Sequence, residues 1–326
     1  METLFVAKDA RLSREGATLL VSRADRPKAR VPIAGLGHVV LAGEAGLTSA
    51  LLSLFGRSGV RVTVLDWYGN VAGAFEPRGS PSAGRVRLAQ ARHASEPALG
   101  MVLARSIVSG ALANLLANLR YRAYRGVKGV KPAITAIDEL GAKIPAVSDV
   151  PTLMGLEGSA RAWYYKAWGA IDERLAFGNR VRRPPNNRIN CLISWFNGLA
   201  YAAVRNEIAK THLDDCISFL HSPTAARHSL ALDLSEVFKP ALCDALIIEL
   251  VLRDRPAATW FHEEEAGVCR LKEAGRVATL EEWTRRLDGR TDADTPSMRD
   301  LVRAEALGIE RHVLGIADYK PWRRRV

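Results

Sequence analysis

His221, Asp233 and Glu236 lie close together in the stretch SFLHSPTAARHSLALDLSEVFKP. His221 ends an apolar run, and Asp233 and Glu236 follow it within a predicted helix over 229–238. Their spacing puts the two acids one turn apart at the margin of the apolar face, where a carboxylate needs a partner. Lys239 lies three residues after Glu236 and offers an ion pair. On spacing alone, that ion pair is favoured over a reactive site.

A third acid lies in the helical stretch LMGLEGSARAWYYKAW. Glu157 lies between Gly155 and Gly158, and a glycine inside a helix costs about 1 kcal/mol relative to alanine. The two glycines therefore indicate that something approaches the backbone closely here. The alternative is structural: Glu157 pairs with Arg161 one turn later. In this alternative, Trp163, Tyr164 and Trp168 pack in the core. This stretch alone favours the structural alternative.

Two clusters of basic residues are candidates for phosphate contacts. The first surrounds a Pro-Pro break in FGNRVRRPPNNRINC and contains Arg180, Arg182, Arg183 and Arg188. The second, RYRAYRGVKGVKP, interleaves two tyrosines with two lysines and with Arg120, Arg122 and Arg125. Arginines on a stiff loop suit bidentate phosphate contacts, and basic residues mixed with aromatic ones suit nucleic-acid backbones and unstacked bases. The alternative is that both clusters are only part of a solvated surface. The net charge of the whole chain counts against this alternative.

The chain of 326 residues has a formal net charge of +11 and a sequence pI near 9.8. This excess indicates a polyanionic partner, and nucleic acid is favoured over a membrane because no basic amphipathic segment or lipidation motif is found. Nor is there a signal-peptide pattern or an apolar run of the roughly 18 residues that a membrane helix needs. The four cysteines form no C-x-x-C pair, which is typical of a reduced chain and not of a zinc knuckle. We therefore expect a soluble, cytoplasmic protein.

The elements that must position these residues fall into two regions, and the expected fold class is α+β. A small, mostly-β domain over 1–80 contains five short strands, TLFVA, ATLLVSR, ARVPIA, HVVLAG and RVTVLDW, and one helix in LTSALLSLFG that Gly56 closes. A linker over 81–90 separates it from a larger, all-α domain over 91–326, which carries the candidate site. Within this second domain, TWFHEEEAGVCRLKEAGR predicts a short hairpin with Ala266 and Gly267 in its turn, and the basic tail YKPWRRRV is expected to be mobile without a ligand.

Three blocks of sequence, in order, resemble the CRISPR-associated spacer integrase family, the nucleases of CRISPR adaptation. The blocks are LMGLEGSARAWYY, FGNRVRRPPNNRINCLISW, and FLH followed by RHSLALDLSEVFKPALCD. The strand-rich start of the chain also resembles the β domain of this family, so the resemblance spans essentially the whole chain. Each motif alone is degenerate, but their order and spacing together are specific.

The resemblance implies a metal site formed by one histidine and two acids from separated helices. Carried over by motif, its ligands are Glu157, His221 and Glu236, with Asp233 as a further catalytic residue in or beside the coordination sphere. Carboxylate oxygens suit Mg²⁺ or Mn²⁺, and one imidazole nitrogen favours tolerance of Mn²⁺. The arginines of the two basic clusters, together with Arg161, are then the expected DNA-binding residues.

The implied reaction is a metal-dependent transesterification, in which the 3′-hydroxyl of a short DNA duplex attacks a repeat-edge phosphodiester. Water in its place would give endonuclease activity. The resemblance also implies double-stranded and branched DNA as substrates, a homodimer formed through the β domain, and a small ferredoxin-like partner protein that bridges two dimers. Two other functions stay open. One is a structure-specific, metal-dependent endonuclease that acts on branched DNA in repair, and the other is a non-catalytic DNA-binding scaffold in which Glu157, His221 and Glu236 only satisfy one another.

The chain departs from the family pattern around His221. The family usually has a Gly-Leu-Asp-Pro run before this histidine, whereas HLDDCISFLH places His212 and Asp215 at the glycine and proline positions. Proline is also common where His228 stands. None of these departures removes a ligand of the implied metal site, and their expected effect is on the local shape of the loop.

Overall fold

The computed structural model describes residues 2–7, 9–24, 26–77, 83–222, 228–264, 267–292 and 294–325. An N-terminal region built mainly from strands precedes a mostly helical remainder, so the predicted α+β class is confirmed. By packing, the chain divides into two compact units. Unit 1 combines Met1–Pro81, Val181–Ala202 and Pro256–Thr284, and unit 2 combines Ser82–Arg180, Ala203–Arg255 and Arg285–Val326. The predicted domain boundaries remain predictions.

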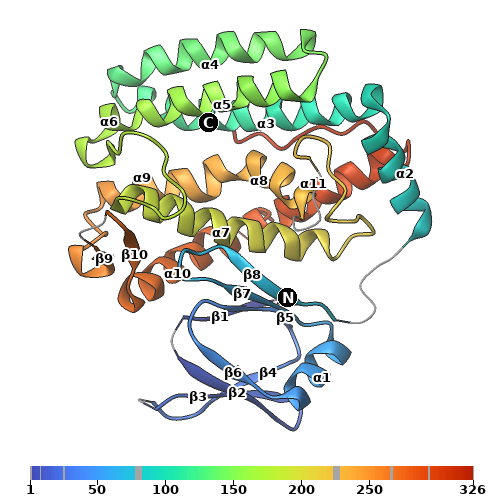
Figure 1. The fold of residues 1–326 in the computed structure, drawn as a ribbon, viewed down its shortest axis with the longest axis vertical. Helices are drawn as coiled ribbons and strands as arrows, with labels where there is room; N and C mark the ends of the chain where they lie inside the picture. The colour runs from blue at the N-terminus through green and yellow to red at the C-terminus, as the bar shows by residue number, and fades with distance from the viewer. Residues whose placement is uncertain are drawn as a thin grey trace. The chain divides into compact units, whose positions relative to one another are not determined.

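Unit 1 contains two four-stranded sheets that share an apolar core (Figure 1). The first has the order β1 (Glu2–Val6), β5 (Leu36–Leu41), β7 (Arg61–Leu65) and β8 (Val71–Phe75), and its strands are parallel except for β8. The second has the order β4 (Ala29–Pro32), β3 (Thr18–Ser22), β2 (Ala10–Glu15) and β6 (Ala45–Leu47). Helix α1 (Ser49–Ser58) contributes Leu51, Leu54 and Phe55 to the core. Neither sheet therefore buries its apolar face alone.

The five predicted strands correspond to β1, β3, β4, β5 and β7, whereas the sequence pattern does not indicate β2, β6 and β8. Strand β2 reads ARLSRE and buries only Leu12 fully, so its polar residues hide the signal. The prediction that Gly56 closes α1 is wrong. The helix continues to Ser58 and ends at Gly59, whose φ of 70° is the left-handed conformation that glycine adopts readily.

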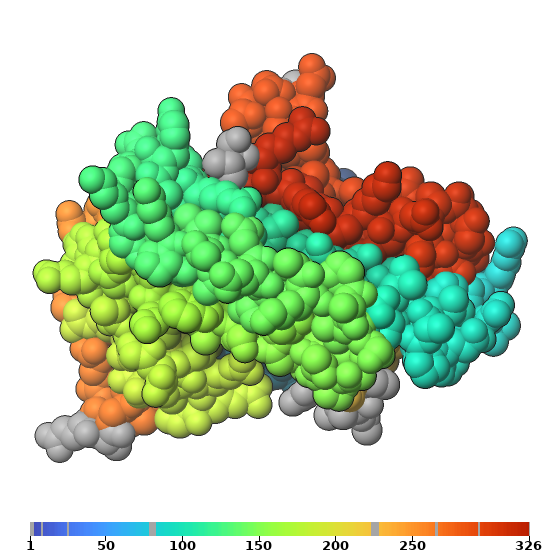
Figure 2. Space-filling model, turned by 90° about the horizontal axis from the view of Figure 1, so that it is seen from above, coloured from blue at the N-terminus to red at the C-terminus, as the bar shows by residue number. Residues whose placement is uncertain are grey.

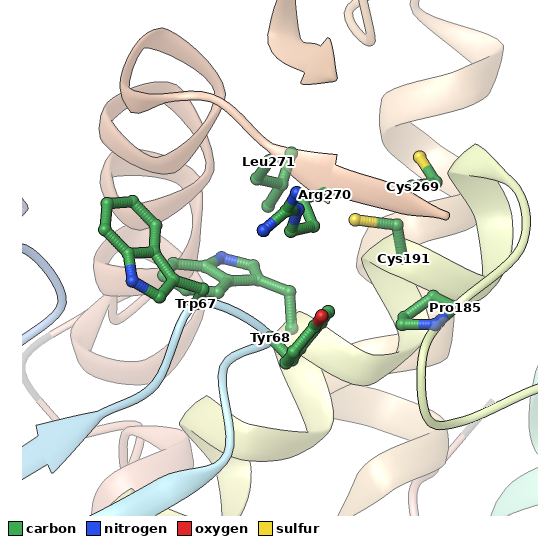
Figure 3. Close-up of a pocket in the computed structure, with 8 residues that line it drawn as sticks. Trp67, Tyr68, Pro185, Cys191, Cys269, Arg270 and Leu271 are labelled. Carbon is green, nitrogen blue, oxygen red and sulfur yellow. The ribbon is translucent and has the colours of Figure 1, made fainter. Parts of the chain in front are cut away.

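The predicted hairpin is present in unit 1, where β9 (Phe261–Glu263) pairs with β10 (Cys269–Leu271) in antiparallel fashion. Gly267, with a φ of 74°, lies in the connection, and Ala266 of the predicted turn lies outside the described residues. A small pocket beside β10 is lined by Trp67, Tyr68, Pro185, Cys191, Trp195, Cys269, Arg270 and Leu271 (Figure 3). The connection from β7 to β8 crosses helix α7 (Arg188–Ile208) closely here, since a Cβ on Gly69 would lie 2.9 Å from the Trp195 Cα.

Unit 2 is helical in the part of the chain that the structure describes. Its helices are α2 (Gly84–Ser95), α3 (Pro97–Tyr124), α4 (Lys131–Lys143), α5 (Val150–Lys166), α6 (Trp168–Ile171), α8 (Ser229–Lys239), α9 (Ala245–Leu252) and α11 (Met298–Val313). Short 3₁₀ turns are η1 (Lys128–Val130), η2 (Ile144–Ala146), η3 (Glu173–Leu175) and, in unit 1, η5 (Ala258–Trp260). Helices α7 and α10 (Glu273–Asp288) contribute residues to both units. Helix α2 occupies most of the segment 81–90 that is expected as a linker, and residues 81 and 82 lie outside the described part.

Helix α3 is the central element of unit 2 and packs against α4, α5 and α8 (Figure 1). It is long and apolar enough to meet the criteria for a membrane span, but most of its apolar window is buried against these helices. Two buried amides fix its neighbours. The Asn114 side chain donates to the Val237 carbonyl at 2.8 Å, and the Asn118 side chain donates to the Pro240 carbonyl at 2.6 Å. Both bonds hold the end of α8 in register with α3.

The basic tail is packed on unit 2, so the prediction of a mobile tail is wrong for its described residues, 319–325. The Tyr319 hydroxyl donates to the buried Glu305 carboxylate at 2.5 Å, and the Trp322 N–H donates to the same group at 3.0 Å. Trp322 also stacks on Phe238 of α8, with ring centroids 5.2 Å apart. Figure 2 shows this red segment lying beside the green helices of unit 2. The tail is held by two aromatic residues, Tyr319 and Trp322, and its basic composition alone does not indicate this packing.

Candidate metal centre

Helix α5 presents Glu157 and Arg161 on one face, one turn apart. The helix begins where the Asp149 carboxylate accepts a hydrogen bond from the Thr152 N–H at 2.8 Å, and Pro151 suits its first turn. Nε of Arg161 lies 2.8 Å from Oε1 of Glu157, so the ion pair expected from their spacing is present. Local sequence therefore determines the first half of the site.

The two glycines beside Glu157 have no close neighbour within the described chain. Gly155 and Gly158 are exposed, and a Cβ built on either would meet nothing within 4 Å. The close approach expected from the sequence is thus not made by any residue that the structure describes. Their face of α5 is open to an external molecule.

The Arg161 guanidinium also joins α5 to α8. Its Nη2 lies 2.6 Å from Oε2 of Glu236, and its Nη1 lies 3.9 Å from Oδ2 of Asp244. Nζ of Lys239 lies 2.6 Å from Oε1 of Glu236, which is the second ion pair expected from spacing. The side chains of Arg161 and Glu236 are only 13% and 11% exposed, so these charges interact with little screening by solvent.

The cations dominate the electrostatics of Glu236. Burial by itself would raise the pKa of this carboxyl, but Lys239 and Arg161 outweigh burial and lower the pKa to about 2. The charge of His221 lowers the pKa of Glu236 in the same direction. The carboxylate is therefore ionised across the physiological pH range and available as a ligand.

Asp244 is a functional candidate that the sequence analysis did not single out. It ends the π-helical turn η4 (Pro240–Asp244), is fully buried, and neither carboxylate oxygen accepts a hydrogen bond from any residue that the structure describes. Burial raises its pKa to about 7, although Arg161 and Lys239 act in the opposite direction. The signal was available, because this acid interrupts the apolar run PALCDALIIELV.

Asp233 positions His221. Its carboxylate is fully buried and accepts hydrogen bonds from the backbone N–H groups of Phe219, Leu220 and His221 at 2.8 to 3.0 Å. The His221 ring contributes a further contact, with Nδ1 2.9 Å from Oδ1 of Asp233. This contact directs Nδ1 of the ring toward Asp233, which leaves Nε2 as the nitrogen suited to a ligand. Asp233 thus lies beside the expected ligands and holds one of them.

The three expected ligands form a donor set that suits a hard divalent cation, namely two carboxylates and one imidazole. Their donor atoms do not all come within 4.8 Å of one another in the described part of the chain, because Arg161 bridges the two carboxylates. The Arg161 guanidinium supplies the positive charge between the two carboxylates. If this guanidinium left Glu157 and Glu236, the neighbouring Asp244 carboxylate could accept it. With Arg161 moved away, Glu157, His221 and Glu236 would be the residues that hold a hard divalent cation.

The arginines expected to contact DNA differ in their surroundings. Arg182 and Arg183 are exposed on the loop before α7, as is Arg125 after α3, whereas Arg180 and Arg122 are half-buried. Two others are exposed but engaged in ion pairs: Arg120 lies 2.8 Å from Asp138, and Arg188 lies 2.7 Å from Glu263. Arg161 differs most, since its guanidinium is taken up by buried acids. It contributes to the site more directly than to a DNA-binding surface.

Comparison with known proteins places this geometry in a family. The family described as CRISPR associated protein Cas1 matches residues 4–285. The CRISPR-associated endonuclease Cas1 2 of Thermodesulfovibrio yellowstonii is 32% identical over 327 residues, covering 98% of each chain.

Two solved structures share the fold. A Cas1 protein from Thermotoga maritima superposes with a TM-score of 0.87 at 28% identity, covering 99% of this chain and 100% of that one. A chain of a Cas6-RT-Cas1–Cas2 complex superposes over all of this chain and 36% of its own length, with a TM-score of 0.87 at 20% identity. On the match to the family over most of its length, this chain belongs to the Cas1 family of CRISPR-associated proteins.

Proposed function

We propose that this protein is the integrase of CRISPR adaptation, a metal-dependent DNA endonuclease and transesterase that inserts short DNA duplexes into the repeat array. The observation that supports the proposal is that Arg161 joins Glu157 to Glu236 in unit 2 of a Cas1-family chain, although the two acids lie 79 positions apart in sequence (157 to 236), and that the charge of His221 acts on Glu236. The endonuclease activity named for the relative from Thermodesulfovibrio yellowstonii is consistent with this proposal.

Glu157, His221 and Glu236 would hold Mg²⁺ or Mn²⁺. When bound, such an ion polarises the scissile phosphate and neutralises charge on the leaving oxygen. Asp233 fixes the ring of His221 so that Nε2 faces a ligand, and Lys239 keeps Glu236 ionised. In the transesterification, the attacking 3′-hydroxyl loses its proton and forms a new P–O bond, while the bond to the leaving 3′ oxygen breaks and that oxygen gains a proton.

The exposed arginines Arg182 and Arg183, on a loop stiffened by two prolines, are residues that would hold DNA backbones. Arg120, Arg122, Arg125 and Arg188 would extend the contact, aided by the exposed Tyr124 as a stacking surface. The substrates are double-stranded and branched DNA. Affinity should fall steeply with salt if phosphate contacts dominate.

We further propose a homodimer formed through the N-terminal β domain, a cytoplasmic location, and a small ferredoxin-like adaptation protein as partner. The structural neighbour that is part of a Cas6-RT-Cas1–Cas2 complex supports assembly with a second CRISPR protein.

A second candidate is the non-catalytic scaffold, because Arg161 and Lys239 already satisfy both carboxylates. The experiment that separates the candidates is strand transfer on a branched DNA resembling a half-integrated product, which needs no partner protein. The purified chain is assayed with Mn²⁺, Mg²⁺ or EDTA, beside Glu157→Ala and His221→Ala. Metal-dependent resealing that both variants lose supports the integrase.

Three other outcomes have distinct meanings. Hydrolysis without resealing supports a repair endonuclease for branched DNA. Tight DNA binding with neither reaction supports the scaffold. Activity that survives in both variants would show that the reaction occurs elsewhere in the molecule.

A further inference from the structure

A second group of metal-ligating side chains lies at the start of α8, outside the site formed by Glu157, His221 and Glu236. Among the described residues, Asp215, Cys216 and His228 are the group of three donors whose ligand atoms all lie within 4.8 Å of one another. Nδ1 of His228 lies 2.9 Å from Oδ1 of Asp215, and Sγ of Cys216 lies 3.6 Å from that oxygen and 3.7 Å from that nitrogen. One oxygen, one sulfur and one nitrogen thus form a compact triangle.

These separations fit a tetrahedral metal of the zinc type. With metal–nitrogen and metal–oxygen distances of about 2.0 to 2.1 Å, a metal–sulfur distance of about 2.3 Å and tetrahedral angles, sulfur should lie about 3.6 Å from either other donor, and nitrogen about 3.3 Å from oxygen. The two observed sulfur separations agree with this geometry. The nitrogen–oxygen pair, now linked through a hydrogen bond, has to open by only about 0.4 Å.

We propose that Asp215, Cys216 and His228 form a binding site for Zn²⁺ or a similar soft divalent cation, with three protein ligands and an open fourth position. Thiolate and imidazole select this class of metal, in contrast to the oxygen-rich donor set of Glu157, His221 and Glu236. Cys216 is exposed and the His228 side chain is 38% exposed, so solvent can fill the fourth position. Binding replaces the Cys216 thiol proton, which is released to solvent.

The backbone around the three donors is braced. The carbonyl of Asp215 accepts from the Leu230 N–H at 3.0 Å, and the carbonyl of Cys216 accepts from the Ser229 hydroxyl at 2.9 Å. Nε of the buried Arg205 lies 3.1 Å from Oδ2 of Asp215, which orients the carboxylate and leaves Oδ1 toward the other donors. The positive charge of Arg205 lowers the affinity for a cation but does not occupy the ligand position.

The ligands of this site lie on both sides of His221 in sequence, because Asp215 and Cys216 precede it and His228 follows it. A metal here would link Asp215 and Cys216 to the start of α8, near the loop whose backbone N–H groups donate to Asp233.

The test is a titration of the chelator-treated, full-length protein with Co²⁺, a spectroscopic substitute for Zn²⁺, followed by displacement with Zn²⁺. A sulfur-to-cobalt charge-transfer band at one equivalent is expected, and it cannot come from the Glu157–His221–Glu236 site, which contains no sulfur. Cys216→Ser should remove the band, and His228→Gln should weaken Zn²⁺ binding by at least about tenfold. His212→Gln is the matched control, because that histidine also pairs with an acid, Glu310, at 2.8 Å but has no cysteine beside it.

Alkylation of Cys216 with iodoacetamide gives an independent measurement, and Zn²⁺ should protect this thiol in the wild-type protein and in Glu157→Ala alike. The proposal is overturned if no charge-transfer band forms, or if the band survives in Cys216→Ser and so arises from another cysteine. Circular dichroism of each variant confirms folding before these outcomes are compared. Because the readouts are binding and protection, they stand apart from the strand-transfer assay of the proposed function.

Discussion

Two fully buried carboxylates, eleven positions apart in sequence, have opposite surroundings. Asp233 accepts hydrogen bonds from three consecutive backbone N–H groups and contacts Nδ1 of His221. Asp244 accepts none from the described residues, and its nearest cation, Arg161, lies 3.9 Å away. Burial alone therefore does not determine what a carboxylate does, because the surrounding donors decide whether it is fixed or left available.

The contrast assigns two roles. Asp233 is committed to the structure, since its hydrogen bonds shape the loop that presents His221. Asp244 accepts no hydrogen bond from the described residues, and burying a carboxylate in this way destabilises the folded protein. The arrangement is explained if Arg161 moves toward Asp244 when a metal ion binds Glu157 and Glu236.

Replacing Asp233 should cause the largest loss of stability. Asp233→Ala leaves three backbone N–H groups and the His221 ring without their acceptor, so the free energy of unfolding in urea should fall by about 3 to 5 kcal/mol. Asp138→Ala is the matched control, because this exposed acid pairs with Arg120 at the surface and should cost less than about 1 kcal/mol. Equal losses in the two variants would contradict the structural role of Asp233.

Removing Arg161 should destabilise the metal-free protein and increase its response to metal. Arg161→Gln leaves three neighbouring acids with less positive charge, and a loss of roughly 2 to 3 kcal/mol is expected without metal. Because Mn²⁺ no longer has to displace a guanidinium, it should raise the melting temperature of the variant more than that of the wild type. Arg174→Gln, which removes an exposed arginine paired with Asp172, is the control. A smaller metal response in Arg161→Gln would contradict the proposed exchange.

The pH dependence of stability should reveal Asp244. As pH rises, the unfolded chain releases this proton near the usual pKa of 3.8, whereas the folded protein keeps it until about 7. The folded state therefore loses stability between these values and retains the penalty above them. Asp244→Asn should be nearly neutral below about pH 4 and stabilising, by roughly 1 to 3 kcal/mol, at pH 8.

Unfolding measured across this pH range checks the prediction. Burial also raises the pKa of Glu305 to about 7, so Glu305 makes stability fall with pH in the same way as Asp244 does. This second contribution should remain in Asp244→Asn. Equal destabilisation by Asp244→Asn at every pH would contradict the absence of a hydrogen-bond donor for this carboxylate among the described residues.

The smallest effect is expected on the open face of α5. Gly158→Ala should stabilise the free protein by about 0.5 to 1 kcal/mol, because the position is helical and its Cβ meets nothing. If DNA approaches this face, the same methyl group should weaken binding to branched DNA. Unfolding and binding assays on the one variant measure both effects. Stabilisation with unchanged binding would mean that DNA does not approach this face.

Sequence alone predicted much of the local structure. Periodicity indicated five of the eight strands that the structure describes within the first 80 residues and the helices that carry Glu157 and Glu236, and spacing indicated the pairs Glu157–Arg161 and Glu236–Lys239. It missed strands with few buried side chains, such as β2, because their alternation is mostly polar. These predictions concern residues that are at most four positions apart. The geometry of a helix or strand alone determines how such residues lie relative to one another.

Only the tertiary structure decided how the halves of the site meet. Arg161 reaches Glu236 because α3 packs against both α5 and α8, and the buried amides of Asn114 and Asn118 hold that packing. The isolation of Asp244 and the docking of Trp322 on Phe238 arise in the same way. A sequence pattern specifies which face of each helix is apolar. It does not specify which polar groups lie together once those faces are buried, because this depends on the packing of helices far apart in the chain.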